Sequence, residues 1–132
     1  IGYFVGSVGL IAALDKIRDS YNVNGLGQIA AEATLKHMSF YYSNFGKIIR
    51  FREDTAVQLA EVGFQTLPSQ TNFILTKPPR FKSSTWLKKL RERKILVRWF
   101  KDPRVEDFIR ITIGNEKEMQ TLLRAVKIIL RD

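Results

Sequence analysis

Two arginines lie in strand-like stretches of this sequence, and their positions suggest a site for an anion. Arg98 lies in ILVRWF (95–100) and Arg110 lies in FIRITIG (108–114). Side chains alternate between the two faces of a strand, so each arginine faces away from the neighbouring isoleucines. If the isoleucines pack under helices, both guanidiniums point to the same open face of a sheet. The planar fork of arginine binds a carboxylate or phosphate through two parallel hydrogen bonds.

The open face predicted for these strands is only partly polar. Leu96, Phe100 and Phe108 share it with the two arginines. A half-apolar surface with two guanidiniums suits the wall of a cleft that another domain closes. The alternative is an arginine on a solvated sheet face or in a structural ion pair, and spacing alone does not separate the two.

The elements that must position these arginines follow from the periodicity after Gly63. Residues 64–69 and 71–76 are predicted strands, and the two prolines of KPPRFKSS indicate a loop. Ser83 or Ser84 is expected to cap a helix over 85–94. After the strands at 95–100 and 108–114, Asn115 is expected to cap the closing helix in a capping-box pair with Glu118.

The first 63 residues are predicted to be mainly helical. IGYFVGS (1–7) has the pattern of a short buried strand, and apolar spacing indicates a helix up to about Tyr21. Asn24 can cap a helix over 25–38, and a longer helix over about 40–62 ends at Gly63. The prediction is therefore an α+β fold. Its small, mostly antiparallel sheet has helices packed on one face, and helices and a strand precede it.

Composition limits the possible functions without choosing one. The chain has 132 residues, a net charge of +9 and no cysteine, which excludes a disulfide framework and a thiolate zinc site. The positive charge could serve nucleic acid, an anionic membrane or acidic substrates. A basic nucleic-acid-binding module is one alternative, although no RNA-recognition aromatic pair or zinc spacing is present. His37 is the only histidine and has no metal-ligand partner at useful spacing, so no metal site is predicted.

Five segments in the same order resemble the C-terminal part of fold-type-I aminotransferases, which use pyridoxal phosphate. The segments are IGYFVGS, YNVNGLGQIAAEATL, LPSQTNFIL, ILVRWF and FIRITIGNEKEM. The likeness extends over essentially the whole chain and is greatest to the histidinol-phosphate aminotransferases. It implies that residues 1–38 are a remnant of the large domain and interdomain helices. Residues 39–132 would form the small, C-terminal domain.

The resemblance also implies which site residues are present and which are not. Arg110 matches the family arginine that binds the acidic group of the substrate, and Arg98 matches a second position that assists in phosphate-binding members. Asn72 matches a recurrent asparagine with a structural role beside the cleft. The family lysine that holds pyridoxal phosphate lies before the segment matching IGY. No catalytic or cofactor-binding residue is therefore expected here, and the piece alone should be inactive and bind no cofactor.

The partners that the resemblance implies belong to a longer parent protein. They are an N-terminal large domain, an amino donor and a keto acid or phosphorylated substrate, and a second subunit in a homodimer. The expected location is cytoplasmic, with neither nucleic acid nor membrane as a partner. Two alternatives remain: a phospho-amino-acid decarboxylase of the same fold, and a stand-alone interaction domain. A complete domain is also possible, although the start at IGYFVGS without methionine favours a piece of a longer protein.

Overall fold

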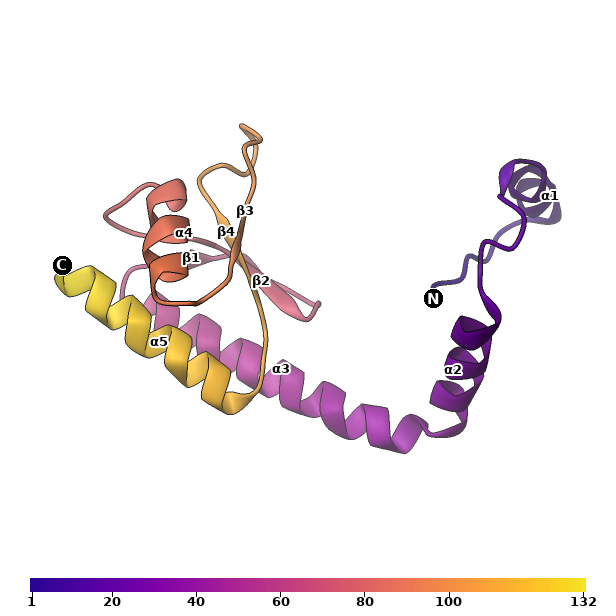
Figure 1. The fold of residues 1–132 in the computed structure, drawn as a ribbon, viewed down its shortest axis with the longest axis horizontal. Coiled ribbons are helices and arrows are strands. Elements are labelled where there is room, and N and C mark those ends of the chain that lie inside the picture. The colour runs from indigo at the N-terminus through magenta and orange to yellow at the C-terminus, as the bar shows by residue number, and fades with distance from the viewer. The chain divides into compact units, whose positions relative to one another are not determined.

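The computed structural model describes residues 1–132, and Figure 1 shows its helices and strands in chain order. They are α1 (Val8–Ile17), α2 (Gly25–Lys36), α3 (Met38–Ala60), β1 (Gln65–Thr66), β2 (Phe73–Lys77), α4 (Ser83–Glu92), β3 (Arg98–Trp99), β4 (Ile109–Thr112) and α5 (Glu116–Arg131). None of these helices is long and apolar enough to span a membrane. The chain divides into two compact units, Ile1–Ser43 and Asn44–Asp132, which are described separately. The predicted domain boundary after residue 38 stays a prediction.

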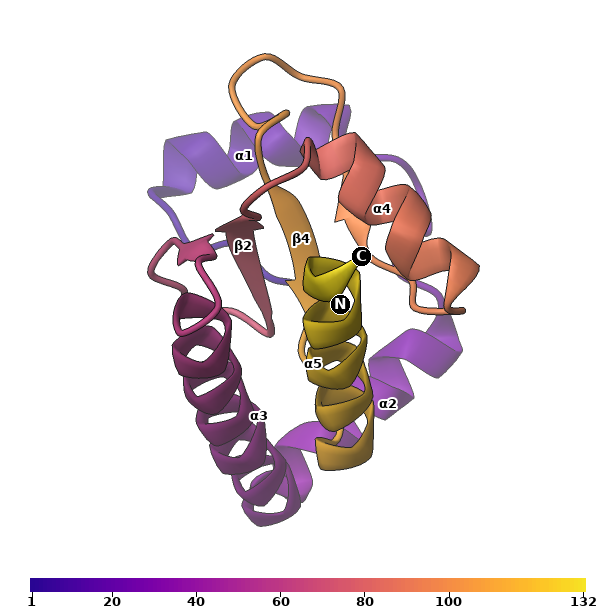
Figure 2. The same ribbon diagram turned by 90° about the vertical axis from the view of Figure 1, so that its left-hand side faces the viewer.

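The second unit has the α+β architecture that the sequence predicts. Its four strands form one sheet in the order β1-β2-β4-β3, and every neighbouring pair is antiparallel. The part of α3 within this unit, α4 and α5 lie on one side of β2 and β4 (Figure 2). The opposite side of the sheet has no helix of this unit over it. The layer order therefore leaves one sheet face open.

The core lies between the sheet and its helices. Ile109, Ile111 and Ile113 are all buried, as their alternation predicts, and Trp86 of α4 is fully buried beneath them. The indole Nε1 of Trp86 donates a hydrogen bond of 2.9 Å to the carbonyl of Pro79, so its polar atom is satisfied. The apolar stripe of α5 completes the core with Met119, Leu122, Leu123, Val126 and Ile129.

Local signals place the ends of two helices where the sequence predicts them. Gly63 follows α3 with φ +90°, a left-handed conformation that favours glycine. Asn115 accepts a hydrogen bond from the backbone N–H of Glu118, and the Glu118 carboxylate accepts one from the backbone of Asn115. This capping box starts α5 directly after β4, so it also fixes where the last strand ends.

The predicted serine cap of α4 is wrong. Lys82 stands at the N-cap position and makes no side-chain capping bond. Ser83 is instead the first helical residue, and its hydroxyl donates a 2.6 Å hydrogen bond to the carbonyl of Asp107. The Ser83 hydroxyl therefore bonds to a residue distant in sequence and does not cap the helix as the sequence predicts. This bond ties the start of α4 to the loop before β4.

The first unit differs most from its prediction. Residues 1–7 form no strand, because no other strand offers them a partner, and Tyr3 is 94% exposed. The helix predicted to reach Tyr21 ends at Ile17, and Tyr21 itself has a φ of +56° in the turn that follows. Asn24 does cap α2, since its side chain accepts a hydrogen bond from Gly27 N. Neither α1 nor α2 contains a buried residue, so this unit has no core of its own.

We expect Asn115→Ala to lower the free energy of unfolding by about 1 kcal/mol, because it removes one half of the capping box. Urea unfolding followed by tryptophan fluorescence measures the change. The matched control is Asn22→Ala, since Asn22 is exposed and caps no helix. An equal effect of the two substitutions would contradict the role given to the capping box.

Candidate functional site

The antiparallel register places the two candidate arginines side by side. Arg98 of β3 is paired directly with Arg110 of β4, and Leu75 of β2 is paired with Arg110 from the other side. All three point to the sheet face opposite the helices, because Ile109 and Ile111 fill the helical side. We call this surface, with Phe73 and Phe100, the arginine face. Directly paired residues have Cα atoms about 4.5–5.5 Å apart, so two like charges meet here.

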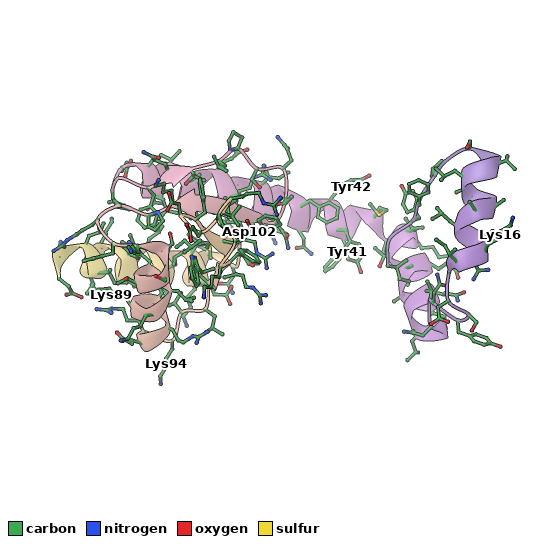
Figure 3. All side chains as sticks on the ribbon, turned by 90° about the horizontal axis from the view of Figure 1, so that it is seen from above. Lys16, Tyr41, Tyr42, Lys89, Lys94 and Asp102 are labelled. Carbon is green, nitrogen blue, oxygen red and sulfur yellow. The ribbon has the colours of Figure 1, made fainter.

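No carboxylate of the chain balances this pair. Neither Arg98 nor Arg110 forms an ion pair with any described residue. Arg104 in the loop before β4 is the contrast: its Nε and Nη2 donate to the two oxygens of Asp102 at 3.1 and 2.9 Å. Those bonds lower the pKa of Asp102 and raise the pKa of Arg104. Asp102, labelled in Figure 3, lies in the loop between β3 and β4.

Aromatic rings hold the guanidinium of Arg110 in place. Its Cζ lies 5.2 Å from the ring centroid of Phe73 and 5.6 Å from that of Phe100. Arg98 Cζ lies 5.3 Å from the same Phe100 ring. These distances are within the range of cation–π attraction. Arg110 Nε is fully buried and donates to nothing in the chain, which is the one such side-chain atom in the structure.

This arrangement can bind an anionic group. A contact with a ring face accepts no conventional hydrogen bond from the in-plane N–H donors of a guanidinium, so the rings do not pair these donors. A carboxylate or phosphate could receive a bidentate fork from Arg110 with a second charge beside it from Arg98. The structure thus brings both predicted substrate-binding residues together on one open face. Whether they bind substrate stays a prediction.

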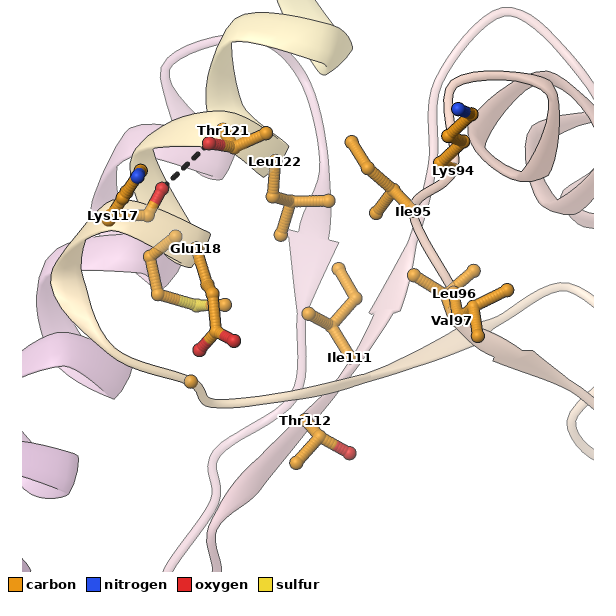
Figure 4. A pocket seen from close by; sticks show the side chains of 12 residues that line it. Lys94, Ile95, Leu96, Val97, Ile111, Thr112, Lys117, Glu118, Thr121 and Leu122 are labelled. Atoms are coloured by element: carbon orange, nitrogen blue, oxygen red, sulfur yellow. Dashed lines mark hydrogen bonds between the residues drawn. The ribbon is translucent and has the colours of Figure 1, made fainter.

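A hollow of the second unit lies elsewhere. It has a volume of about 500 Å³ and lies between residues 94–97, the end of β4 and the first half of α5 (Figure 4). Ile95, Val97 and Leu122 line it, and Thr121 donates to the backbone of Lys117 at its rim (2.7 Å). Neither arginine lines it. A second hollow of about 460 Å³ lies between α3 and the segment from β1 to β2.

His37 and Asn72, the other residues considered in the sequence, make contacts with the backbone. His37 is exposed at the end of α2, with Nδ1 2.9 Å from the carbonyl of Ala33, so that nitrogen donates. No cluster of histidine and acidic residues that could hold a metal ion is present. The carbonyl of Asn72 accepts a 2.9 Å bond from Ile113 N, which extends the pairing of β2 and β4.

Sequence reasoning missed Phe73 as a neighbour of Arg110. The signal was available in part, because Phe73, Leu75 and Lys77 alternate with the buried Ile74 and Thr76 in β2. What the sequence could not show was that β2 pairs with β4, a partner more than 30 residues further along the chain.

The comparisons with known proteins define the family. The model of the family described as aminotransferase class I and II matches residues 1–126. The chain therefore belongs to the class I and II aminotransferase family. This result confirms the resemblance seen in the five sequence segments.

Individual relatives place the chain near one branch of that family. It is 38% identical over 130 residues to a histidinol-phosphate aminotransferase from Microcystis aeruginosa, a match that covers 98% of this chain and 37% of that protein. It is also similar to the solved structure of histidinol-phosphate aminotransferase from Sinorhizobium meliloti in complex with pyridoxal-5'-phosphate. That match has a TM-score of 0.80 and 27% identity, over 93% of this chain and 34% of that one.

A third likeness shows the fold alone. L-threonine-O-3-phosphate decarboxylase from Porphyromonas gingivalis matches 97% of this chain and 41% of its own, with a TM-score of 0.80 and 23% identity. All these matches share one property: the chain spans well under half of each relative.

We expect an unfavourable coupling between Arg98 and Arg110 in the anion-free protein, because like charges oppose each other across the two strands. A double-mutant cycle with Arg98→Gln and Arg110→Gln should give about 0.2–1 kcal/mol at low ionic strength, decreasing as salt is added. Urea unfolding of the four proteins measures it. The control cycle pairs Arg98 with Arg104, whose charge Asp102 balances. A favourable coupling between Arg98 and Arg110 would contradict an unbalanced pair.

Proposed function

We propose that this chain is the C-terminal, substrate-binding portion of a pyridoxal-phosphate-dependent aminotransferase of the histidinol-phosphate type. Arg110 binds the acidic group of the substrate, and Arg98 assists it. One observation carries the proposal: the guanidinium of Arg110 lies within cation–π distance of two rings on an open sheet face, with no ion-pair partner and no acceptor for its Nε. The similarity to histidinol-phosphate aminotransferases supports the type of reaction.

The contribution of this chain is to bind and orient. Two parallel hydrogen bonds from one guanidinium fix the rotation of a carboxylate or phosphate as well as its position. Fixing that end of a small substrate also fixes the direction of its reacting carbon, which is where orientation lowers the barrier. The substrates would be an amino donor and a keto acid or phosphorylated compound, each with an acidic group for Arg110.

In this proposal the covalent anchor of the cofactor is not supplied by this chain. Pyridoxal phosphate, when bound, supplies the electron sink for amino-group transfer, and it needs an available amine as its anchor. The resemblance to the family gives none of the lysines of this chain the position of the lysine that holds the cofactor. We therefore assign no catalytic or cofactor-binding residue to this chain and expect it to be inactive by itself.

The remaining parts of the proposed enzyme would come from elsewhere. An N-terminal large domain would hold the cofactor, and residues 1–38 would be its remnant together with interdomain helices. The exposed apolar side chains of the first unit, such as Val8, Ile17 and Leu26, are of the kind that another domain covers. A homodimer located in the cytoplasm is part of the same proposal.

A phospho-amino-acid decarboxylase is the weaker second candidate. Its support is the Porphyromonas gingivalis structure, and that likeness extends to the fold alone. Both enzymes would need an arginine for an acidic group, so the arginine face does not separate them. The product separates them, because a decarboxylase releases CO₂ whereas an aminotransferase transfers the amino group to a keto acid.

We expect Arg110→Ala, in the enzyme that carries this chain with its cofactor domain, to lower kcat/KM for acidic substrates by about 100-fold or more. Two charge-assisted hydrogen bonds to the substrate are lost. The visible absorbance of the bound cofactor should stay the same, because Arg110 is assigned to the substrate and not to the cofactor.

Arg104→Ala is the matched control for this experiment. It also removes one arginine near the same strand, but one that is already paired with Asp102. Unchanged kinetics in the Arg110 variant would remove Arg110 from the site. An equal decrease of kcat/KM in the Arg104 variant would mean that general positive charge, and not the arginine face, attracts the substrate.

A further inference from the structure

We propose that Phe100 is a positioning residue that holds Arg98 and Arg110 together as one receptor for a doubly charged anion, with Phe73 acting on Arg110 alone. This inference rests on the proposed function, because it assumes that the arginine face binds the acidic group of the substrate. It concerns a side chain that would not contact the substrate itself.

The geometry shows one ring shared by two cations. The Phe100 ring centroid lies 5.3 Å from Arg98 Cζ and 5.6 Å from Arg110 Cζ. Phe73 lies within reach of Arg110 only, at 5.2 Å. Arg110 therefore contacts two rings, Phe73 of β2 and Phe100 directly after β3, whereas Arg98 contacts Phe100 alone.

The ring of Phe100 offsets a charge repulsion that the strand pairing creates. Arg98 and Arg110 are direct cross-strand partners, and two like charges in that position repel. An acidic neighbour would relieve the repulsion, but it would also occupy the N–H donors, as Asp102 does with Arg104. A ring attracts both cations through its π-face and accepts no conventional hydrogen bond from their in-plane donors, so it does not pair them as a carboxylate would.

The consequence is a preference between anions. With Phe100 in place, both guanidiniums are held toward the same space, so a dianionic phosphate monoester can be bound by the two together. A monoanionic carboxylate needs only the fork of Arg110, which Phe73 still holds. Loss of the Phe100 ring should therefore weaken phosphate binding more than carboxylate binding.

The test compares two probes, methyl phosphate and acetate, with the full chain at pH 7.5. The phosphate monoester is mainly a dianion there, because its second pKa is about 6. Titrations followed through the arginine Nε–H resonances give both dissociation constants. We expect Phe100→Leu to raise the dissociation constant of methyl phosphate by about tenfold and that of acetate by less than about threefold, because two cation–π contacts are lost.

Two further variants separate positioning from general structure. Phe100→Tyr keeps the π-face and should restore methyl phosphate binding to within about twofold of the original protein. Phe81→Leu is the matched control, because the Phe81 ring also lies within cation–π distance of two cations, Arg80 and Lys89, but outside the arginine face. It should leave both dissociation constants unchanged.

The outcomes distinguish this inference from the function on which it rests. If Arg110→Gln abolishes methyl phosphate binding while Phe100→Leu acts like Phe81→Leu, the role of Phe100 is refuted and the function stands. If Arg110→Gln has no effect, the proposed function itself fails. Should Phe100→Leu not fold, the unsubstituted protein still provides a test: ring currents should shift the Hδ protons of both arginines upfield. Ordinary shifts would overturn the inference.

Discussion

Two positive charges placed opposite each other without a counter-ion are the constraint around which the second unit is arranged. The β4–β3 register makes Arg98 and Arg110 direct partners, and the chain provides no carboxylate to either. Such a pair costs stability in the free protein, so the rest of the unit must hold it. The two rings reduce that cost without pairing the N–H donors, and Arg110 Nε is buried without an acceptor.

Stability and binding are divided between the two faces of one small sheet. On the helical side, the isoleucines of β4 pack with Trp86 and the stripe of α5 into a single core. Because the side chains of a strand alternate, every core isoleucine in β4 places its neighbour on the arginine face. The rigidity of the core is thereby transmitted to Arg110 through the backbone of β4 itself. A site on a strand is held more precisely than a site on a loop.

The features that depend on periodicity could be predicted from the sequence, and those that depend on distant partners could not. Alternation in β4 predicted that Arg110 lies on the sheet face opposite to that of Ile109 and Ile111. The capping signal of Asn115 and Glu118 predicted the start of α5. The strand predicted for residues 1–7 does not form, because an apolar run becomes a strand only where another backbone pairs with it. The hydroxyl of Ser83 and the ring of Phe73 likewise found partners far along the chain.

The position of the anion on the arginine face can be measured directly by a crystal structure of this chain, alone or within its larger enzyme, with a phosphorylated substrate analogue. The account predicts an acidic group at about 2.7–2.9 Å from two nitrogens of Arg110, with Arg98 on a further oxygen and the ring of Phe100 in contact with both guanidiniums. An analogue bound elsewhere, with Arg110 paired to a carboxylate of the protein, would contradict it.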